Sequence, residues 1–199
     1  MVDNLAEKAT NVFLQNFRLC PHNTNMSYDE WRVKLWEEAL PRSYVSLANE
    51  IYKEWLKLRY DYVFLPPGVK SLLIYLRNNY LLGLITNGSS SSQWEKVEQL
   101  KLNQYFDCIL VSGDLPWEKP HQNIFLKACQ ILKVKPEDCL MVGDRLETDI
   151  AGAKEASLAG AVWIPNSVKQ TEEHYKSTPD YILTSVTQLK DLLCSHIKS

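Results

Sequence analysis

Apolar side chains in the first sixty residues recur at intervals of three and four, which is the spacing of one face of an α-helix. Three such stripes are present, in residues 5–17, 28–40 and 44–55. The segment "CPHNTNMS" (20–27) separates the first two stripes with proline, asparagine and serine. No strand pattern precedes Tyr60, and "PPG" at 66–68 ends the region. The sequence therefore predicts a helical unit at this end of the chain.

Beyond residue 62 the pattern changes to short runs that are apolar throughout, alternating with amphipathic stripes. Short strands that are apolar on both faces and separated by helices are typical of a parallel sheet covered on both sides. We therefore expect an α/β fold, with a helical domain at residues 1–62 and an α/β domain at residues 63–199. The expected strands are "LLGLIT" (81–86), "CILVS" (108–112), "CLMVG" (139–143) and "AGAVWI" (159–164). The expected helices lie at 69–76, at 93–100, at 121–132, where the helix begins after Pro120, and near 150–158.

The charge balance argues against a polyanionic partner. The net charge is −2, from 22 basic and 24 acidic side chains spread along the chain, and no basic block suggests a nucleic-acid groove. The hydrophobic content of 45% is ordinary for a globular protein. We therefore expect a small-molecule or protein partner rather than nucleic acid. A membrane is not expected as a partner either, because no apolar run approaches the roughly 18–20 residues needed to cross a bilayer.

The five cysteines indicate a reducing compartment. Their number is odd, no C-x-x-C spacing occurs, and Cys108 and Cys139 begin apolar runs. Buried free thiols are the simplest interpretation, and free thiols persist where the surroundings are reducing. A cytoplasmic location is therefore expected.

Carboxylates follow the predicted strand at 139–143. Ligands bind at the carboxyl ends of the strands in open parallel sheets, and Asp144 stands at such an end. A carboxylate there must remain solvated or bind a cation, and Mg²⁺ prefers oxygen ligands, so Asp144 is a candidate metal ligand. A helix cap is the alternative for Asp144, and Asp149 is interpreted as a cap or as a supporting acceptor.

Two further positions suit an anion. Thr86, Asn87 and Gly88 follow the predicted strand at 81–86 and offer a hydroxyl, an amide and backbone N–H groups to a phosphate, although a polar turn would have the same composition. Lys119 lies just before a predicted helix, where a cation opposes the helix dipole. An anion pocket would explain this lysine, and an exposed surface lysine is the alternative.

The order of these segments resembles a known family. "LLGLITNGS", "EKPHQNIF" and "LMVGDRLETDIAGAKEA" resemble, in sequence, motifs two, three and four of the haloacid dehalogenase superfamily, and the resemblance runs from about Val63 to the closing "PDYILTSVTQLKDLL". It implies a Rossmann-like parallel sheet with an α-helical cap, and a Mg²⁺-dependent phosphatase acting on a small sugar phosphate.

The resemblance also implies roles for individual residues. Thr86 and Asn87, with the backbone of Gly88, would bind the phosphate. Lys119 would neutralise the charge of the nucleophile and of the transferring phosphoryl group. Asp144 would coordinate Mg²⁺, with Asp149 in support. The helical segment would form part of the cap that selects the substrate.

The family's first motif is not found in these 199 residues. That motif is a strand ending in Asp-x-Asp-x-Thr, whose aspartates act as nucleophile and as general acid and base. No two aspartates here stand two positions apart. In the family this strand lies between the strands expected at 81–86 and 139–143. We therefore expect a chain that lacks its first core strand, through a truncated gene model or a short isoform, and that is inactive as written. The alternative is a non-catalytic isoform that binds phosphate or a partner.

Overall fold

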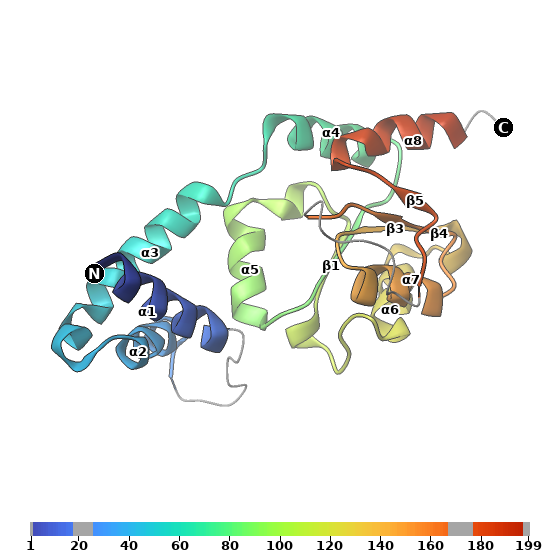
Figure 1. Cartoon of the computed structure of the whole chain (residues 1–199). Helices are drawn as coiled ribbons and strands as arrows, with labels where there is room; N and C mark the ends of the chain where they lie inside the picture. Colours follow the sequence, from blue (N-terminus) through green and yellow to red (C-terminus); the bar gives the residue numbers. More distant parts are fainter. Residues whose placement is uncertain (1, 18–25, 167–176, 197–199) are drawn as a thin grey trace. The chain divides into compact units, whose positions relative to one another are not determined.

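The computed structural model describes residues 2–17, 26–166 and 177–196. The chain divides into two compact units, Met1–Phe64 and Leu65–Ser199, called here the helical unit and the core unit. Figure 1 shows the helices of the first unit in blue and cyan and the mixed second unit in green to red. In the described part of the chain, no helix is both long enough and apolar enough to cross a membrane.

The helical unit contains the three helices that the apolar stripes predict. Ser27 explains the start of the second helix, because its side chain accepts from the backbone N–H of Glu30 while the Glu30 carboxylate accepts from the backbone N–H of Ser27. Phe13 is fully buried and stacks on Trp36, with ring centroids 4.2 Å apart. The helices are α1 (Val2–Phe17), α2 (Tyr28–Ala39) and α3 (Ala48–Tyr62), and a 3₁₀ turn at Arg42–Leu47 precedes α3.

A guanidinium is buried in the core of the helical unit. Arg32 is 1% exposed, and its guanidinium lies 4.0 Å from the ring centroid of Tyr28. The Tyr52 hydroxyl donates to the carboxylate of Asp29, and the Arg32 side chain donates to the same hydroxyl at 3.4 Å. Burial and the Asp29 contact raise the pKa of Tyr52 to about 12. The helical unit thus has a core of its own, with a charged group held inside it.

The core unit alternates helices and strands along the chain. The regular elements are α4 (Pro67–Arg77), β1 (Gly83–Thr86), α5 (Ser90–Gln99), β2 (Cys108–Val111), α6 (Gln122–Leu132), β3 (Leu140–Gly143), α7 (Ala151–Glu155), β4 (Gly160–Trp163), β5 (Tyr181–Ile182) and α8 (Leu189–His196). Short 3₁₀ turns occur at Leu102–Gln104, Ser112–Asp114, Pro136–Asp138 and Val186–Gln188, and a π-helical turn occurs at Leu146–Ile150.

The strands form two parallel sheets. β1 pairs with β2, with Thr86 opposite Val111, and β3 pairs with β4, with Gly143 opposite Trp163. β5 joins the free side of β4. Within the described residues, β1 has a strand partner only in β2 and β3 only in β4, so the two sheets share no ladder. One edge of β1 and one edge of β3 therefore pair with no strand among the described residues.

Helices cover both faces of the three-stranded sheet, as the uniformly apolar strands predict. Along β4, Val162 packs with Leu72 of α4 and Leu189 of α8, whereas its neighbours Ala161 and Trp163 pack in the cluster that contains the π-helical turn and α7. Side chains of a strand alternate between the two faces, so α4 and α8 lie on one face and α7 on the other (Figure 1). The predicted α/β class is confirmed.

Several boundaries differ from the predictions, for example β1, which begins at Gly83 and not at Leu81. α6 begins after Pro120, as predicted, and the turn before it is closed by a hydrogen bond from the His121 N–H to the Glu118 carbonyl at 2.9 Å. The helix expected near 150–158 begins as the π-helical turn and ends at Glu155. The short strand β5 was not expected, because two paired residues give too little pattern to detect.

Candidate active site

The first part of the site lies where β1 ends. The Thr86 hydroxyl donates to the side-chain oxygen of Gln93 on α5 at 2.9 Å. Gly88 has a φ of 137°, a backbone conformation that side chains rarely permit, and its N–H donates to the Ser112 hydroxyl at 3.0 Å. The turn after β1 is therefore anchored to α5 and to the end of β2.

Asn87 fixes the backbone of Lys119. Its amide nitrogen donates to the Lys119 carbonyl at 2.8 Å, and its amide oxygen accepts from the Lys119 N–H at 2.9 Å. Both polar ends of the Asn87 side chain are thus engaged with one residue that lies 32 positions further along the chain. Asn87 therefore holds the loop that contains Lys119, called here the lysine loop, against the end of β1.

Lys119 is largely enclosed by the protein, so the alternative of an exposed surface lysine does not describe it. Its ammonium lies 2.7 Å from a carboxylate oxygen of Asp149, and the two side chains are 12% and 3% exposed. The same ammonium donates to the Ile85 carbonyl in β1 at 3.0 Å. The lysine therefore links β1 of one sheet to the turn that follows β3 of the other.

Asp149 is held at the carboxyl end of β3. One carboxylate oxygen accepts from Lys119, and the other accepts from the backbone N–H groups of Asp144 and Arg145, both at 3.0 Å. Gly143 makes room for it, because a Cβ at that position would lie 2.3 to 2.5 Å from atoms of the Asp149 side chain. Asp149 is thus an acceptor for groups of the protein itself, and its role in support of a metal ligand stays a prediction.

Asp144 projects from the same end of β3 and is partly exposed. Its carbonyl accepts from the indole N–H of Trp163 at 3.0 Å, and one carboxylate oxygen accepts from the Asn166 amide. The turn that follows has no side-chain cap, so the capping alternative for Asp144 is not observed. The Asp144 carboxylate keeps one oxygen without a bond among those described.

A magnesium ion fits this donor set only with help from outside the chain. The described residues contain no group of three side chains able to hold a metal, and both oxygens of Asp149 already accept hydrogen bonds. Of the two aspartates at this end of β3, Asp144 is the one whose carboxylate keeps an oxygen without a bond among the described residues. Mg²⁺ is often held by one or two carboxylates together with substrate phosphate and water, so a site built on Asp144 suits that ion better than a fully enclosed protein site.

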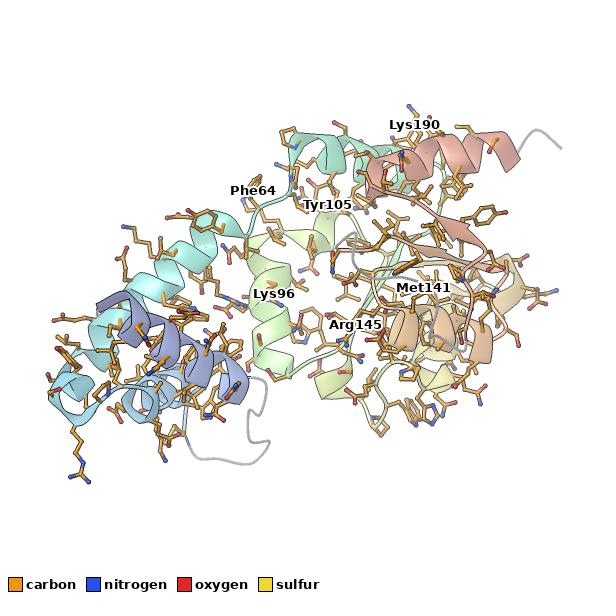
Figure 2. The ribbon with its side chains drawn as sticks, viewed as in Figure 1. Phe64, Lys96, Tyr105, Met141, Arg145 and Lys190 are labelled. Atoms are coloured by element: carbon orange, nitrogen blue, oxygen red, sulfur yellow. The ribbon has the colours of Figure 1, made fainter. Side chains whose placement is uncertain are left out.

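A charged pair flanks this end of β3. Figure 2 labels Met141 within the strand and Arg145 just beyond its end. The Arg145 guanidinium lies 2.7 Å from the Glu147 carboxylate, and this hydrogen bond raises the pKa of Arg145. The backbone N–H of Glu147 and the Arg145 guanidinium lower the pKa of Glu147. Both groups are charged near neutral pH and lie beside Asp144 in the sequence.

The structure brings the sequence-predicted residues together through direct bonds. Asn87 contacts Lys119, Lys119 contacts Asp149, and Asp149 contacts the backbone of Asp144. Several contributors were missed, among them Gln93 and Ser112. Ser112 gave a weak signal as the polar last residue of an apolar run, whereas Gln93 gave none, because a polar residue in the first turn of a helix is unremarkable in a sequence.

Comparison with known proteins defines the class. Residues 13–162 match the family model of haloacid dehalogenase-like hydrolases, well over half of the chain. The chain belongs to this family, and the expected family is confirmed.

Phosphatases are among its most similar relatives. N-acylneuraminate-9-phosphatase of Homo sapiens is 38% identical over 182 residues, covering 88% of this chain and 73% of that protein. Glyceraldehyde 3-phosphate phosphatase of Pyrococcus furiosus is 36% identical over 137 residues, covering 68% of this chain and 57% of that protein. A haloacid dehalogenase-type phosphatase of Thermococcus onnurineus has a similar fold, with a TM-score of 0.62 at 24% identity, covering 96% of this chain and 80% of that one.

Proposed function

We propose that the core unit binds phosphate and magnesium in a phosphatase of sialic acid biosynthesis, and that the substrate is N-acylneuraminate 9-phosphate. One observation carries this proposal. Lys119 is buried against Asp149 and is fastened to the end of β1 by Asn87, beside the residues that end β3. A lysine held in this way at the carboxyl ends of parallel strands suits the transfer of a phosphoryl group.

The Lys119 ammonium would stabilise the charge that develops on the transferring phosphoryl group. Its position is set before substrate binds, because the Asp149 carboxylate and the Ile85 carbonyl fix two of its hydrogen bonds. A cation that needs no reorganisation during the reaction stabilises the transition state more than a mobile one. Asp149 would act by orienting Lys119.

The phosphate would lie against the turn that follows β1. The Thr86 hydroxyl would exchange its bond to Gln93 for one to a phosphate oxygen, and backbone N–H groups of the turn would add further donors. Asn87 already uses both ends of its amide on Lys119. Its contribution to phosphate binding would therefore be indirect, through the position of the lysine.

Asp144 would be the protein ligand of the magnesium ion. When bound, the ion would supply positive charge to the phosphate oxygens. The Asn166 amide and the Trp163 indole keep Asp144 in place. The nucleophilic aspartate and the acid–base aspartate of the family are not among these 199 residues, so we propose that the chain as written does not hydrolyse phosphomonoesters.

The substrate assignment rests on the relatives. The curated relative from Homo sapiens, which this chain matches over most of its length, bears the name of the sialic acid phosphatase. The helical unit would act as part of a cap that selects the sugar. A cytoplasmic location belongs to the same proposal, because the four cysteines in the described residues are free thiols.

A fusion experiment tests the proposal. An amino-terminal segment with a buried strand ending in Asp-x-Asp-x-Thr, and with the start of a cap, is joined to this chain. We expect Mg²⁺-dependent release of phosphate from N-acylneuraminate 9-phosphate, in preference to simple phosphomonoesters, and no release by the unfused chain. Lys119→Ala in the fusion should lower kcat about a hundredfold, which is about 2.7 kcal/mol of transition-state stabilisation.

Control variants distinguish a loss of activity at the assigned site from a loss caused by misfolding. Lys70→Ala changes an exposed lysine of the same unit and should leave kcat unchanged. If a folded fusion turns over substrate equally well with Asp144→Ala or Lys119→Ala, the assignment of the site is wrong. Mg²⁺-dependent turnover by the unfused chain, abolished by Asp144→Ala, would show instead that another group serves as nucleophile.

The second candidate function is phosphate or partner binding without catalysis, in a short isoform. It is favoured because the bonds that position Lys119 form in a chain without the family's Asp-x-Asp-x-Thr motif. Such an isoform would bind phosphate or pair with a full-length partner. Phosphate binding by the unfused chain, with transcripts that begin at Met1, would favour it. An in-frame upstream segment ending in Asp-x-Asp would favour the enzyme.

A further inference from the structure

Two cysteine thiols are in contact in the core unit, away from the candidate active site. The Sγ atoms of Cys129 and Cys139 are 3.7 Å apart, and both cysteines are free. Cys129 lies in the last turn of α6, and Cys139 directly precedes β3. Asp144 follows the opposite end of that strand, so the thiol pair and the candidate active site lie at opposite ends of β3.

The backbone of each cysteine is fixed by hydrogen bonds. The Cys129 carbonyl accepts from the Val134 N–H at 3.1 Å, where the chain reverses through Lys133 in a left-handed conformation. The Cys139 N–H donates to the Pro136 carbonyl at 3.0 Å, and its carbonyl accepts from the Ala159 N–H at 2.9 Å. The contact between the two sulfurs is therefore a property of the folded core unit.

The two thiols differ in their access to solvent. Cys129 is 6% exposed, whereas Cys139 is partly exposed and donates from its thiol to the Lys135 carbonyl at 3.2 Å. Burial, followed by the contact with Cys129, raises the pKa of Cys139 to about 12. A raised pKa makes thiolate attack slow near neutral pH, so the pair stays reduced until an oxidant is supplied.

We propose that Cys129 and Cys139 form a redox modification site that closes reversibly into an intramolecular disulfide. A disulfide has an S–S length of about 2.05 Å, so the two sulfurs, now 3.7 Å apart, must approach by about 1.7 Å. The bond would join the end of α6 to the start of β3. This inference does not depend on the proposed function.

The chemistry requires a two-electron oxidant, for which a small-molecule disulfide such as oxidised glutathione serves. The accessible Cys139 thiolate attacks one sulfur of the oxidant, forms a mixed disulfide and releases one glutathione thiol. The Cys129 thiolate then attacks the Cys139 sulfur and releases the second glutathione thiol. Two protein thiols lose two protons and two electrons, and the oxidant is reduced to two thiols.

The test uses the full chain, with two further cysteines replaced. Cys194 is exposed and Cys20 lies outside the described residues, so both are changed to serine. The protein is incubated with oxidised glutathione at pH 8.5, quenched with acid and analysed by intact mass and peptide mapping. We expect a loss of two mass units, a crosslink between the Cys129 and Cys139 peptides, and full reversal by dithiothreitol.

Single variants show which thiol acts first. Cys129→Ser should stop the reaction at a glutathione adduct on Cys139, and Cys108→Ser, which changes a buried thiol elsewhere, should leave crosslinking unchanged. Because the bond closes a loop between residues ten positions apart, the oxidised protein should melt about 5 °C higher.

Two outcomes would overturn the inference. If wild-type Cys139 is glutathionylated or unmodified while Cys129 remains a thiol, the pair is only a packing contact of the reduced protein. If the crosslink forms but lowers the melting temperature, the native fold does not accommodate the bond, and the disulfide is a product of partial unfolding.

Discussion

The Lys119 ammonium and the Asp149 carboxylate lie 2.7 Å apart and are almost fully enclosed by the core unit. This ion pair connects the end of β1 to the turn after β3, although the two strands belong to sheets that share no ladder in the described residues. The pair therefore contributes both to the placement of a cation and to the cohesion of the unit.

Removal of the lysine should destabilise the protein strongly. Lys119→Met leaves the Asp149 carboxylate buried without its cation, which should lower the free energy of unfolding by about 3 kcal/mol. Urea unfolding measures this loss. The control Lys70→Met, at an exposed position on α4, should change the free energy of unfolding by less than about 0.5 kcal/mol. Equal stability of the two variants would mean that the buried pair does not form in solution.

The turn after β3 should not tolerate a side chain at Gly143. Gly143→Ala places a Cβ against the Asp149 carboxylate, with the nearest atom at 2.3 Å, and should cost about 1–3 kcal/mol. Gly68→Ala is the matched control, because its nearest atom would be 3.6 Å away at the start of α4. The control should be neutral or slightly stabilising, and a similar melting temperature for both variants would contradict the packing described here.

The two hydrogen bonds between the Asn87 side chain and the Lys119 backbone, called here the Asn87 clamp, should contribute to the stability of the protein as well as to the geometry of the site. Asn87→Ala removes two hydrogen bonds to the Lys119 backbone, and at about 1 kcal/mol each the variant should lose about 2 kcal/mol. Asn79→Ala removes one bond within an exposed helix end and should cost less. If the two variants unfold at the same urea concentration, Asn87 does not hold the lysine loop.

A surface carboxylate should make stability depend on pH in the acidic range. The Asp180 carboxylate accepts from Lys154 at 2.6 and 2.7 Å, and this interaction lowers the pKa of Asp180 below its usual value of 3.8. A lowered pKa stabilises the folded state above the unfolded-state value, and the contribution is lost as pH falls through the folded-state value.

Asp180→Asn should therefore cost about 1 kcal/mol at pH 7, a modest effect because both side chains are more than a third exposed. The difference from wild type should shrink as pH falls below about 4. Lys154→Gln should cause a similar loss, and the double variant should lose little more than either single variant. Additive losses would show that the two groups do not interact.

The elements of the fold could be predicted because their patterns are local. A stripe such as Leu72 and Leu76 repeats within one helix, and a run such as 139–143 is apolar at every position, so each reveals its structure without knowledge of its neighbours. The π-helical turn could not be predicted in this way. In this turn the Asp149 carboxylate accepts hydrogen bonds from the backbone N–H groups of Asp144 and Arg145, and no apolar periodicity encodes such contacts.

The site was predictable as a set of residues, but its internal bonds were not. Strand ends and the order of the family motifs singled out Thr86, Lys119 and Asp144. The Asn87–Lys119 clamp joins residues 32 positions apart, and only the folded chain shows that the Asn87 amide is engaged with protein. Long-range pairs of this kind depend on how two loops meet, which a single sequence does not specify.

β1 and β3 each have one edge that pairs with no described strand, and this has a consequence for hydrogen exchange. Amide groups along a strand point alternately to its two sides, so a strand paired on one side protects only every second amide. Deuterium uptake should therefore alternate between slow and fast along 83–86 and 140–143, whereas β4, which has a partner on each side, should exchange slowly throughout. A segment that docked as a strand between β1 and β3 would register as protection of the fast amides alone.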